Sequence, residues 1–249
     1  MTPNAQQSTV DAAAVSFTRD RDRIPAYAAW PSTSGPFPGL VLIPDVRGLH
    51  EHYRDVARRF AGCGFYTLAI DLYSREGPPD LPDLAAVSRW IQALPDQRVL
   101  GDVGEAVRYL AERPEVRADR IGITGFCMGG QYALMAACTL EPLAACVSWY
   151  GMLRYHEHSA LKPASPLELA AGLRCPLLGL FGAEDALIPR ADVEELRTIL
   201  QRAGKTHEIH LYPGAGHAFF NDTRPEMYRP AAAADAWPRA IEFLRHNLT

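Results

Sequence analysis

Long apolar runs are absent from this chain of 249 residues: none approaches the ~20 residues that a membrane-spanning helix needs. The polar N-terminus, residues 1–11, lacks the charged segment followed by an apolar segment that marks a secretory signal peptide. Long basic runs are also absent, and the formal net charge is −4. Composition therefore gives no support for a nucleic-acid or membrane partner. An anionic small molecule is still compatible with it, because local arginines can outweigh a mild net charge.

The cysteines do not form the even set that a disulfide framework requires. There are five of them, mostly within apolar segments: Cys63, Cys127, Cys138, Cys146 and Cys175. This pattern favours reduced thiols and a cytoplasmic location. Apart from Cys127, we expect these side chains to be small and buried.

The chain shows no internal repeat and no low-complexity linker. Its 48% hydrophobic and 22% charged residues are typical of a globular protein with a large core. We therefore expect one domain over residues 1–249, with residues 1–12 as a loosely ordered N-terminal segment. A monomer or a small homo-oligomer fits this composition.

Apolar patterns predict an α/β fold. Strands are expected at residues 15–19, 24–30, 39–43, 65–70, 120–124, 144–150, 176–181 and 207–211. Helices are expected at residues 54–62, 84–94, 99–112, 131–139, 192–203 and 231–246, the last with a kink or restart at Pro238. The alternation in the second half predicts a mostly parallel central sheet with helices on both faces, and the first two strands predict an antiparallel edge hairpin. Residues 154–173 are a candidate cap or loop beside the site.

The most informative motif is Gly125-Phe126-Cys127-Met128-Gly129, where a predicted strand meets a predicted helix. A nucleophile on such a tight turn has strained backbone angles, and side chains at the flanking positions would collide with neighbouring chain. The turn also sets the sulfur at a helix N-terminus, where unpaired N–H groups favour a thiolate. The motif predicts that Cys127 is a nucleophile, although it could also be a structural thiol.

Two further polar residues follow later strands, in the chain order nucleophile, acid, histidine. Asp185 follows the strand at 176–181, and His217 follows the strand at 207–211. Since reactive groups gather at the carboxyl ends of parallel strands, we expect Cys127, Asp185 and His217 to form a catalytic triad. Glu184 competes for the acid role, but the Asp-x-x-x-Pro spacing favours Asp185. Taken alone, Asp185 could instead be a helix cap.

An attacked carbonyl also needs donors for its developing negative charge. We expect them to be the backbone N–H groups of Met128, directly after the nucleophile, and of Val46, in the turn after the strand at 39–43. The sequences His50-Glu51-His52 and His156-Glu157-His158 lack the helical i, i+4 spacing of a zinc enzyme. No metal site is therefore expected.

These residues together resemble the dienelactone hydrolase family, cysteine-dependent α/β hydrolases that open enol lactones in chloroaromatic breakdown. The resemblance covers residues 39–248. Its carriers are Gly125-Phe126-Cys127-Met128-Gly129-Gly130, Asp71-Leu72-Tyr73-Ser74-Arg75, Ser148-Trp149-Tyr150-Gly151, Gly182-Ala183-Glu184-Asp185 and Gly216-His217-Ala218-Phe219. It implies an α/β-hydrolase fold and hydrolysis of a small ester or lactone without a metal or cofactor.

The resemblance also implies substrate-binding positions. Asp45 occupies the place of an acidic residue beside the resting thiol, where the family has glutamate. Arg75 matches one arginine that holds a substrate carboxylate, whereas Asn221 stands where a second is expected. Tyr150 is expected in the pocket wall. From the residues alone, Asp45 could cap its own turn and Arg75 could be a surface ion-pair partner.

Two alternatives remain open at this point. One is a general carboxylesterase or thioesterase with the same nucleophile. The other is a ligand-binding or thiol-sensing protein that keeps the fold but does not turn over substrate.

Overall fold

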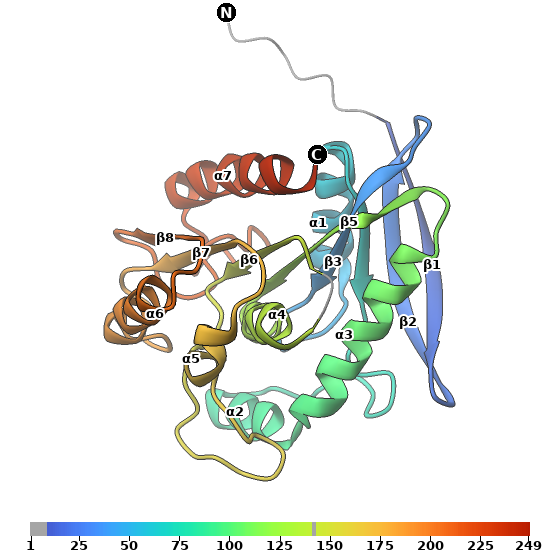
Figure 1. Cartoon of the computed structure of the whole chain (residues 1–249). Coiled ribbons are helices and arrows are strands. Elements are labelled where there is room, and N and C mark those ends of the chain that lie inside the picture. The colour runs from blue at the N-terminus through green and yellow to red at the C-terminus, as the bar shows by residue number, and fades with distance from the viewer. Residues whose placement is uncertain (1–8, 141–142) are drawn as a thin grey trace, which may run out of the picture.

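The computed structural model describes residues 9–140 and 143–249, and an eight-stranded sheet runs through its centre (Figure 1). The strand order is β1-β2-β4-β3-β5-β6-β7-β8. Strands β3 to β8 pair in parallel, while β2 pairs antiparallel with both β1 and β4. The strands are β1 Val10–Arg19, β2 Asp22–Pro31, β3 Phe37–Ile43, β4 Tyr66–Ile70, β5 Val116–Phe126, β6 Ala145–Trp149, β7 Leu177–Gly182 and β8 His207–Tyr212. The predicted α/β fold with an antiparallel edge hairpin is confirmed.

Helices cover both faces of the sheet (Figure 1). Helices α1 and α7 share one face, where Phe60 of α1 and Trp237 of α7 bring their ring centroids to 4.5 Å. Helices α3 and α4 lie on the opposite face. The helices are α1 Glu51–Gly62, α2 Leu84–Ala93, α3 Asp96–Ala111, α4 Met128–Thr139, α5 Pro166–Leu169, α6 Arg190–Arg202 and α7 Pro230–Leu248, with a 3₁₀ turn, η1, at Ala170–Gly172.

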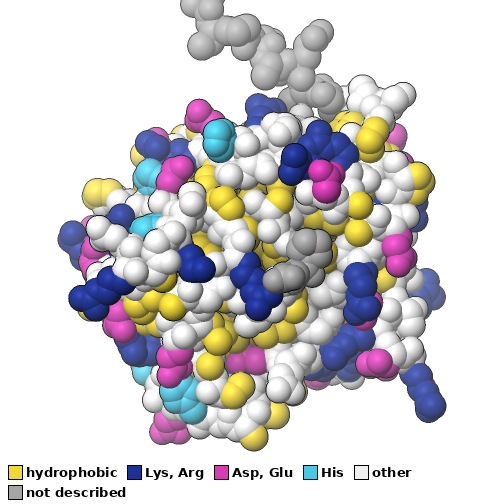
Figure 2. Space-filling view, in the orientation of Figure 1, with side chains coloured by type: hydrophobic (Ala, Val, Ile, Leu, Met, Phe, Trp, Pro, Cys, Tyr) yellow, Lys and Arg dark blue, Asp and Glu magenta, His cyan; other side chains and the backbone are white. Residues whose placement is uncertain are grey.

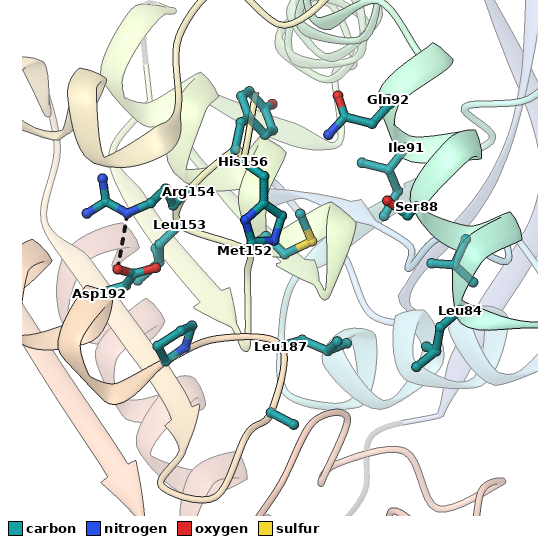
Figure 3. A pocket seen from close by; sticks show the side chains of 14 residues that line it. Leu84, Ser88, Ile91, Gln92, Met152, Leu153, Arg154, His156, Leu187 and Asp192 are labelled. Atoms are coloured by element: carbon teal, nitrogen blue, oxygen red, sulfur yellow. Dashed lines mark hydrogen bonds and ion pairs between the residues drawn. The ribbon is translucent and has the colours of Figure 1, made fainter. Parts of the chain in front are cut away.

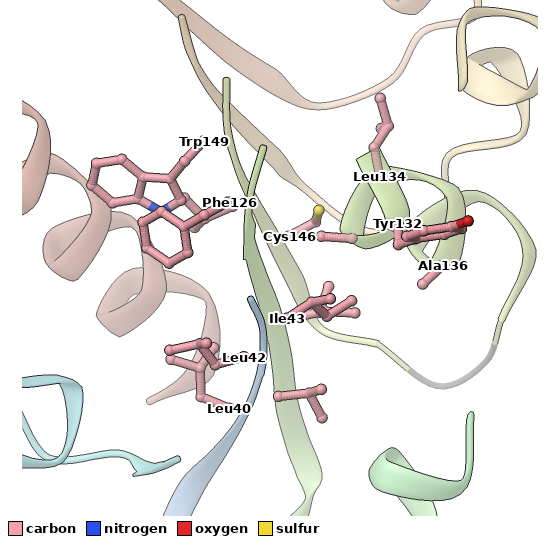
Figure 4. Close-up of a cluster of buried hydrophobic side chains, with 14 of the residues drawn as sticks. Leu40, Leu42, Ile43, Phe126, Tyr132, Leu134, Ala136, Cys146 and Trp149 are labelled. Carbon is pink, nitrogen blue, oxygen red and sulfur yellow. The ribbon is translucent and has the colours of Figure 1, made fainter. Parts of the chain in front are cut away.

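The core lies between these helices and the central strands. Leu40, Leu42 and Ile43 of β3 are fully buried, and β5 and β6 add aromatic rings to the same cluster (Figure 4). The stacked rings of Phe126 and Trp149, 5.2 Å apart, close this cluster at the carboxyl ends of β5 and β6. Packing at the strand ends therefore fixes the residues that directly follow them.

Several predicted boundaries differ from the structure. Val10–Arg19 is one strand, so residues 10–12 pair with residues 29–31 and are not a loose segment; residues 1–8 lie outside the described part. Helices α1 and α3 begin three residues before the predicted starts, because their first turns carry polar residues that the apolar pattern does not register. Helix α7 continues through Pro238 without a restart. Both Pro238 and Ala234 are exposed there, so water can bind the carbonyl that the proline leaves unpaired.

The distribution of charge on the surface and the hydropathy of the helices both bear on function. Figure 2 shows charged side chains of both signs interspersed on the viewed face, with no broad area of one sign. Within residues 9–140 and 143–249, no helix combines the length and apolarity that a bilayer crossing requires.

A buried ion pair ties the segment after β6 to the helices beneath it. Lys162 is fully buried, and its Nζ lies 2.6 Å from Asp96 Oδ1 at the start of α3 and 2.7 Å from the hydroxyl of Tyr132 in α4. The hydroxyl of Tyr155 donates to the same carboxylate and accepts from the side-chain amide of Gln131. Burial lowers the pKa of Lys162, and the contact with Asp96 opposes that shift. Residues 151–165 are thus held against α3 and α4 by buried charge.

We predict that Lys162→Met lowers the free energy of unfolding by about 3–5 kcal/mol, because it leaves the Asp96 carboxylate buried without its counter-ion. Urea denaturation measures the loss. The matched control is Arg239→Met, which breaks the half-exposed ion pair with Asp235 and should cost no more than about 1 kcal/mol. Similar small losses in both variants would contradict the prediction.

Candidate active site

Cys127 occupies the bend between β5 and α4. Its backbone has φ 55° and ψ −118°, in the left-handed region that L side chains rarely adopt. Its amide donates to the Trp149 carbonyl at 3.0 Å, which fixes the strained residue to the end of β6. A Cβ on Gly125 would lie 2.0 Å from the Gly129 oxygen, and one on Gly129 would lie 2.2 Å from the Ile43 oxygen. The bend therefore requires glycine at both positions.

Cys127 differs from the other thiols in its surroundings. Cys138, Cys146 and Cys175 are buried, and burial raises the pKa of Cys138 and Cys175 to about 12 each. Cys63 is only half-buried, which corrects the expectation of full burial, although partial burial also raises its pKa. Cys127 is half-buried as well. Unlike the other four cysteines, it stands at a helix N-terminus, between the end of the central strand β5 and the start of α4.

Asp185 and His217 meet at the carboxyl ends of β7 and β8. The Oδ2 of Asp185 lies 2.8 Å from Nδ1 of His217, and the Asp185 side chain is completely buried. The other oxygen, Oδ1, accepts from the amides of Leu187 at 2.8 Å and Ile188 at 3.2 Å. These bonds fix the carboxylate so that it can hold His217 with Nε2 directed away from Asp185.

The environment of His217 favours its protonated form. Burial alone would lower the pKa of His217, but the negative charge of Cys127 and the hydrogen bond to Asp185 outweigh burial and raise the pKa to about 10. Nε2 of His217 has no hydrogen-bond partner among the described residues. Cys127 therefore lies near enough to act on the imidazole electrostatically, with the ring nitrogen still available for proton transfer. The structure brings Cys127, Asp185 and His217 together.

One tyrosine joins the two segments that are predicted to supply oxyanion amides. Met128 is the first residue of α4, where an amide has no partner within the helix. The hydroxyl of Tyr73 donates to the Val46 carbonyl at 2.9 Å and lies 3.6 Å from the Met128 sulfur. Tyr73 thus links the turn after β3 to the start of α4. The sequence shows Tyr73 only as part of the motif at residues 71–75, from which this contact could not be predicted.

Asp45 is buried in the same region, and its carboxylate is hydrogen-bonded to the backbone of its own turn. Its Oδ1 accepts from the Arg47 amide at 2.8 Å and lies 3.8 Å from Nε2 of His50. Burial alone would raise the pKa of Asp45, but His50 and the Arg47 amide lower it below its ordinary value. Burial raises the pKa of Tyr53, and the nearby charges of Asp45 and Cys127 raise it further.

Tyr150 follows β6 and is strained like Cys127. Its φ is 39°, its side chain is buried, and its hydroxyl has no hydrogen-bond partner among the described residues. Its ring meets the ring of His217 edge-on, with centroids 5.4 Å apart. This places the predicted wall residue beside the histidine.

Arg75 is paired with two aspartates, Asp22 and Asp102. Its guanidinium binds Asp22 at 2.5 Å and the buried Asp102 at 2.7 Å, so two carboxylates already neutralise its charge. This geometry does not favour the predicted clamp on a substrate carboxylate. Asn221 is buried, and its side-chain oxygen accepts from the backbone and hydroxyl of Thr223, which fits a local turn.

The histidine clusters do not form a metal site in the described residues, where no group of three or more histidine, cysteine, aspartate or glutamate side chains could hold an ion. His52 is buried beside Asp222, with its Nδ1 3.4 Å from Oδ1 of that residue. Burial lowers the pKa of His52, and the Asp222 charge partly opposes this.

A cavity of about 350 Å³ lies between α2 and the segments that follow β6 and β7 (Figure 3). One wall is α2, with Leu84, Ser88 and Ile91, and another is the segment from Met152 to His156 that follows Tyr150. Ala186, Leu187 and Pro189, directly after Asp185, form the third wall. The cavity is thus built in part from the chain segments that follow Tyr150 and Asp185, and residues 154–156 of the predicted cap or loop, 154–173, contribute to its lining.

Known proteins share this architecture. A model of the dienelactone hydrolase family matches residues 24–248. A Methylorubrum extorquens protein named "Putative carboxymethylenebutenolidase" is 40% identical over 226 residues, 89% of this chain and 76% of that protein. A Bradyrhizobium protein named "Probable 2-oxo-3-(5-oxofuran-2-ylidene)propanoate lactonase" is 40% identical over 223 residues, 90% of this chain and 89% of that protein.

A solved structure extends the likeness to the whole fold. The Klebsiella pneumoniae protein named "Putative Dienelactone Hydrolase" superimposes with a TM-score of 0.91 at 36% identity, covering 96% of this chain and 99% of that one. Because the family model spans most of the chain and the relatives match along nearly all of it, this chain belongs to the dienelactone hydrolase family.

Proposed function

We propose that the protein is a cysteine hydrolase that cleaves a small ester or lactone, of the dienelactone hydrolase type. The observation that carries this proposal is the His217 imidazole, bound to Asp185 at 2.8 Å and shifted to a pKa of about 10 in part by Cys127. Such an imidazolium next to a thiol at a helix N-terminus favours the reactive thiolate. The names of the relatives, a carboxymethylenebutenolidase and a lactonase, agree with the reaction class.

In the proposed mechanism, the Cys127 thiolate attacks the substrate carbonyl and forms a C–S bond. The amides of Met128 and Val46 hold the resulting oxyanion, and Tyr73 keeps their two segments in register. His217 then gives its Nε2 proton to the leaving oxygen as the C–O bond breaks. The product of this step is an acyl-enzyme.

The second half regenerates the thiolate. His217, now neutral, takes a proton from water as the water oxygen attacks the thioester carbonyl, and the C–S bond breaks to release the acid. Asp185 holds Nδ1–H throughout and stabilises the imidazolium each time it forms. A bound metal or cofactor has no part in this sequence.

We predict that Cys127→Ala lowers kcat/KM for p-nitrophenyl acetate by at least about a thousandfold, because the nucleophile is lost while the fold remains. Steady-state kinetics with repeated turnover measures this. Cys63→Ala, which removes the other half-buried thiol, serves as the control and should keep wild-type activity. Equal rates in wild type and Cys127→Ala would exclude the thiolate mechanism. Stoichiometric labelling of Cys127 without turnover would instead favour the thiol sensor.

A second prediction concerns the acid. Asp185→Asn should reduce kcat on the order of 10³–10⁴-fold with little change in KM, because an amide no longer fixes the imidazole tautomer or stabilises its charge. Glu184→Gln is the matched control: this neighbouring carboxylate is exposed and accepts from the Gly214 amide at 3.1 Å. If Glu184→Gln were the more damaging change, the acid role would pass to Glu184.

A third prediction follows from the His217 pKa. A group whose pKa rises from 6.5 to about 10 on folding contributes stability that is fully present below pH 6.5 and is lost as pH rises through 10. The difference in Tm between wild type and His217→Gln should therefore be largest near pH 6 and should shrink toward pH 10. Calorimetry across this range measures it, and a difference that grows with pH would contradict the proposed ion pair.

A further inference from the structure

Exposed leucines gather at the cavity beside the site. Among the described residues, three large hydrophobic side chains are exposed, and two of them, Leu84 at 69% and Leu187 at 46%, line this one cavity, from α2 and from the segment after β7 (Figure 3). The third, Leu161 at 41%, is not part of its lining. Exposed apolar side chains that converge on a cavity indicate contact with an apolar ligand.

The cavity is also placed to receive part of a substrate. Leu187 donates its amide to Asp185, so the leucine wall is attached directly to the carboxylate that holds His217. Met152 follows Tyr150 by two residues and forms the opposite wall. The cavity has a volume of about 350 Å³, which falls in the range of small-ligand sites, about 300–1,000 Å³.

Charge argues against a carboxylate in this cavity. Arg154 is the lining's cationic side chain, and its guanidinium lies 3.2 Å from Asp192 and 2.5 Å from Glu195. One positive and two negative side chains leave a local excess of negative charge, which repels an anion. The remaining titratable side chains of the lining are Tyr155 and His156. The hydroxyl of Tyr155 is already bonded to Asp96 and Gln131.

The orientation of a bound substrate follows from the leaving group. In the proposed reaction the leaving oxygen must lie at Nε2 of His217, which reaches the site from the loop after β8. No residue of that loop is in the cavity lining, whose walls come from α2, α6 and the segments after β6 and β7. The acyl side of the substrate is therefore the part directed toward the leucines.

We infer, resting on the proposed function, that this cavity binds an uncharged, apolar acyl group and that Leu84 and Leu187 determine this specificity. The enzyme then prefers neutral esters and lactones with an extended apolar acyl portion over those whose acyl portion ends in a carboxylate. This replaces the anionic substrate that the match of Arg75 suggested from sequence.

The test uses p-nitrophenyl esters that share one leaving group and differ only in the acyl part. The series is acetate, butyrate, hexanoate and the monoester of succinate, each rate being corrected by that of Cys127→Ala. We expect kcat/KM to rise from acetate to hexanoate, and butyrate to exceed the succinate monoester by about tenfold or more. Equal values for these two, or a preference for succinate, would overturn the inference.

Variants of the two cavity leucines test whether they determine the acyl specificity. Leu84→Lys and Leu187→Lys should each reduce the hexanoate-to-acetate ratio of kcat/KM by about tenfold and raise relative activity on the succinate monoester, since each puts a cation beside the acyl end. Leu161→Lys is the matched control, a leucine outside the cavity whose exposure is close to that of Leu187, and should leave both ratios unchanged. Unchanged ratios in the two cavity variants would overturn the assignment.

The two proposals fail in different ways. If acetate is hydrolysed just as fast by Cys127→Ala as by wild type, the cysteine mechanism is excluded. If acetate turnover needs Cys127 but the acyl ratios do not depend on Leu84 and Leu187, the mechanism stands and the specificity inference is wrong.

Discussion

The site depends on the close approach of the first turn of α4 to the ends of β3 and β5. At Gly129 the gap to the Ile43 carbonyl is too small for any side chain, and Cys127, two residues earlier, has a φ of 55°. The sulfur stands at a helix N-terminus, and Tyr73 contacts both the Met128 side chain and the turn that carries Val46. The proposed nucleophile and oxyanion donors thus depend on one backbone constraint.

Buried charge is concentrated where the chain leaves the sheet. Asp185, Asp45 and His217 are all withdrawn from water, yet each has a partner that offsets the loss of hydration: two amides, a histidine, and a carboxylate with a thiol. A site built in this way is rigid, since moving any one group leaves another buried without compensation. The strained Tyr150 is held in the same region by its contact with the His217 ring.

The central sheet could be predicted from sequence because its strands are short, apolar and separated by helices of clear periodicity. The approach of Cys127, Asp185 and His217 to one another could be predicted as well, since each residue lies in the segment after a parallel strand and topology brings strand ends together. Helix starts were missed where polar first turns hide the pattern, as at Glu51 and Asp96.

Contacts between residues far apart in the chain could not be predicted. Lys162 and Asp96 are 66 residues apart, and neither residue type indicates burial. Tyr73 resembles any other core tyrosine until the turn after β3 is folded against it. Arg75 shows the same limit: its place in a motif predicted substrate contact, and only the folded structure shows that Asp22 and Asp102 bind its guanidinium. Local pattern records which face a residue takes, whereas tertiary structure decides its partner.

Asp102 has a consequence for the N-terminal edge of the sheet. This buried carboxylate of α3 binds Arg19, at the end of β1, across 83 residues of sequence, and Arg75 in addition. Arg19 also lies 3.7 Å from Asp20 in the hairpin tip, but that carboxylate is exposed, whereas Asp102 is buried. The antiparallel edge of the sheet is therefore anchored to α3 by a buried charge in addition to its strand pairing.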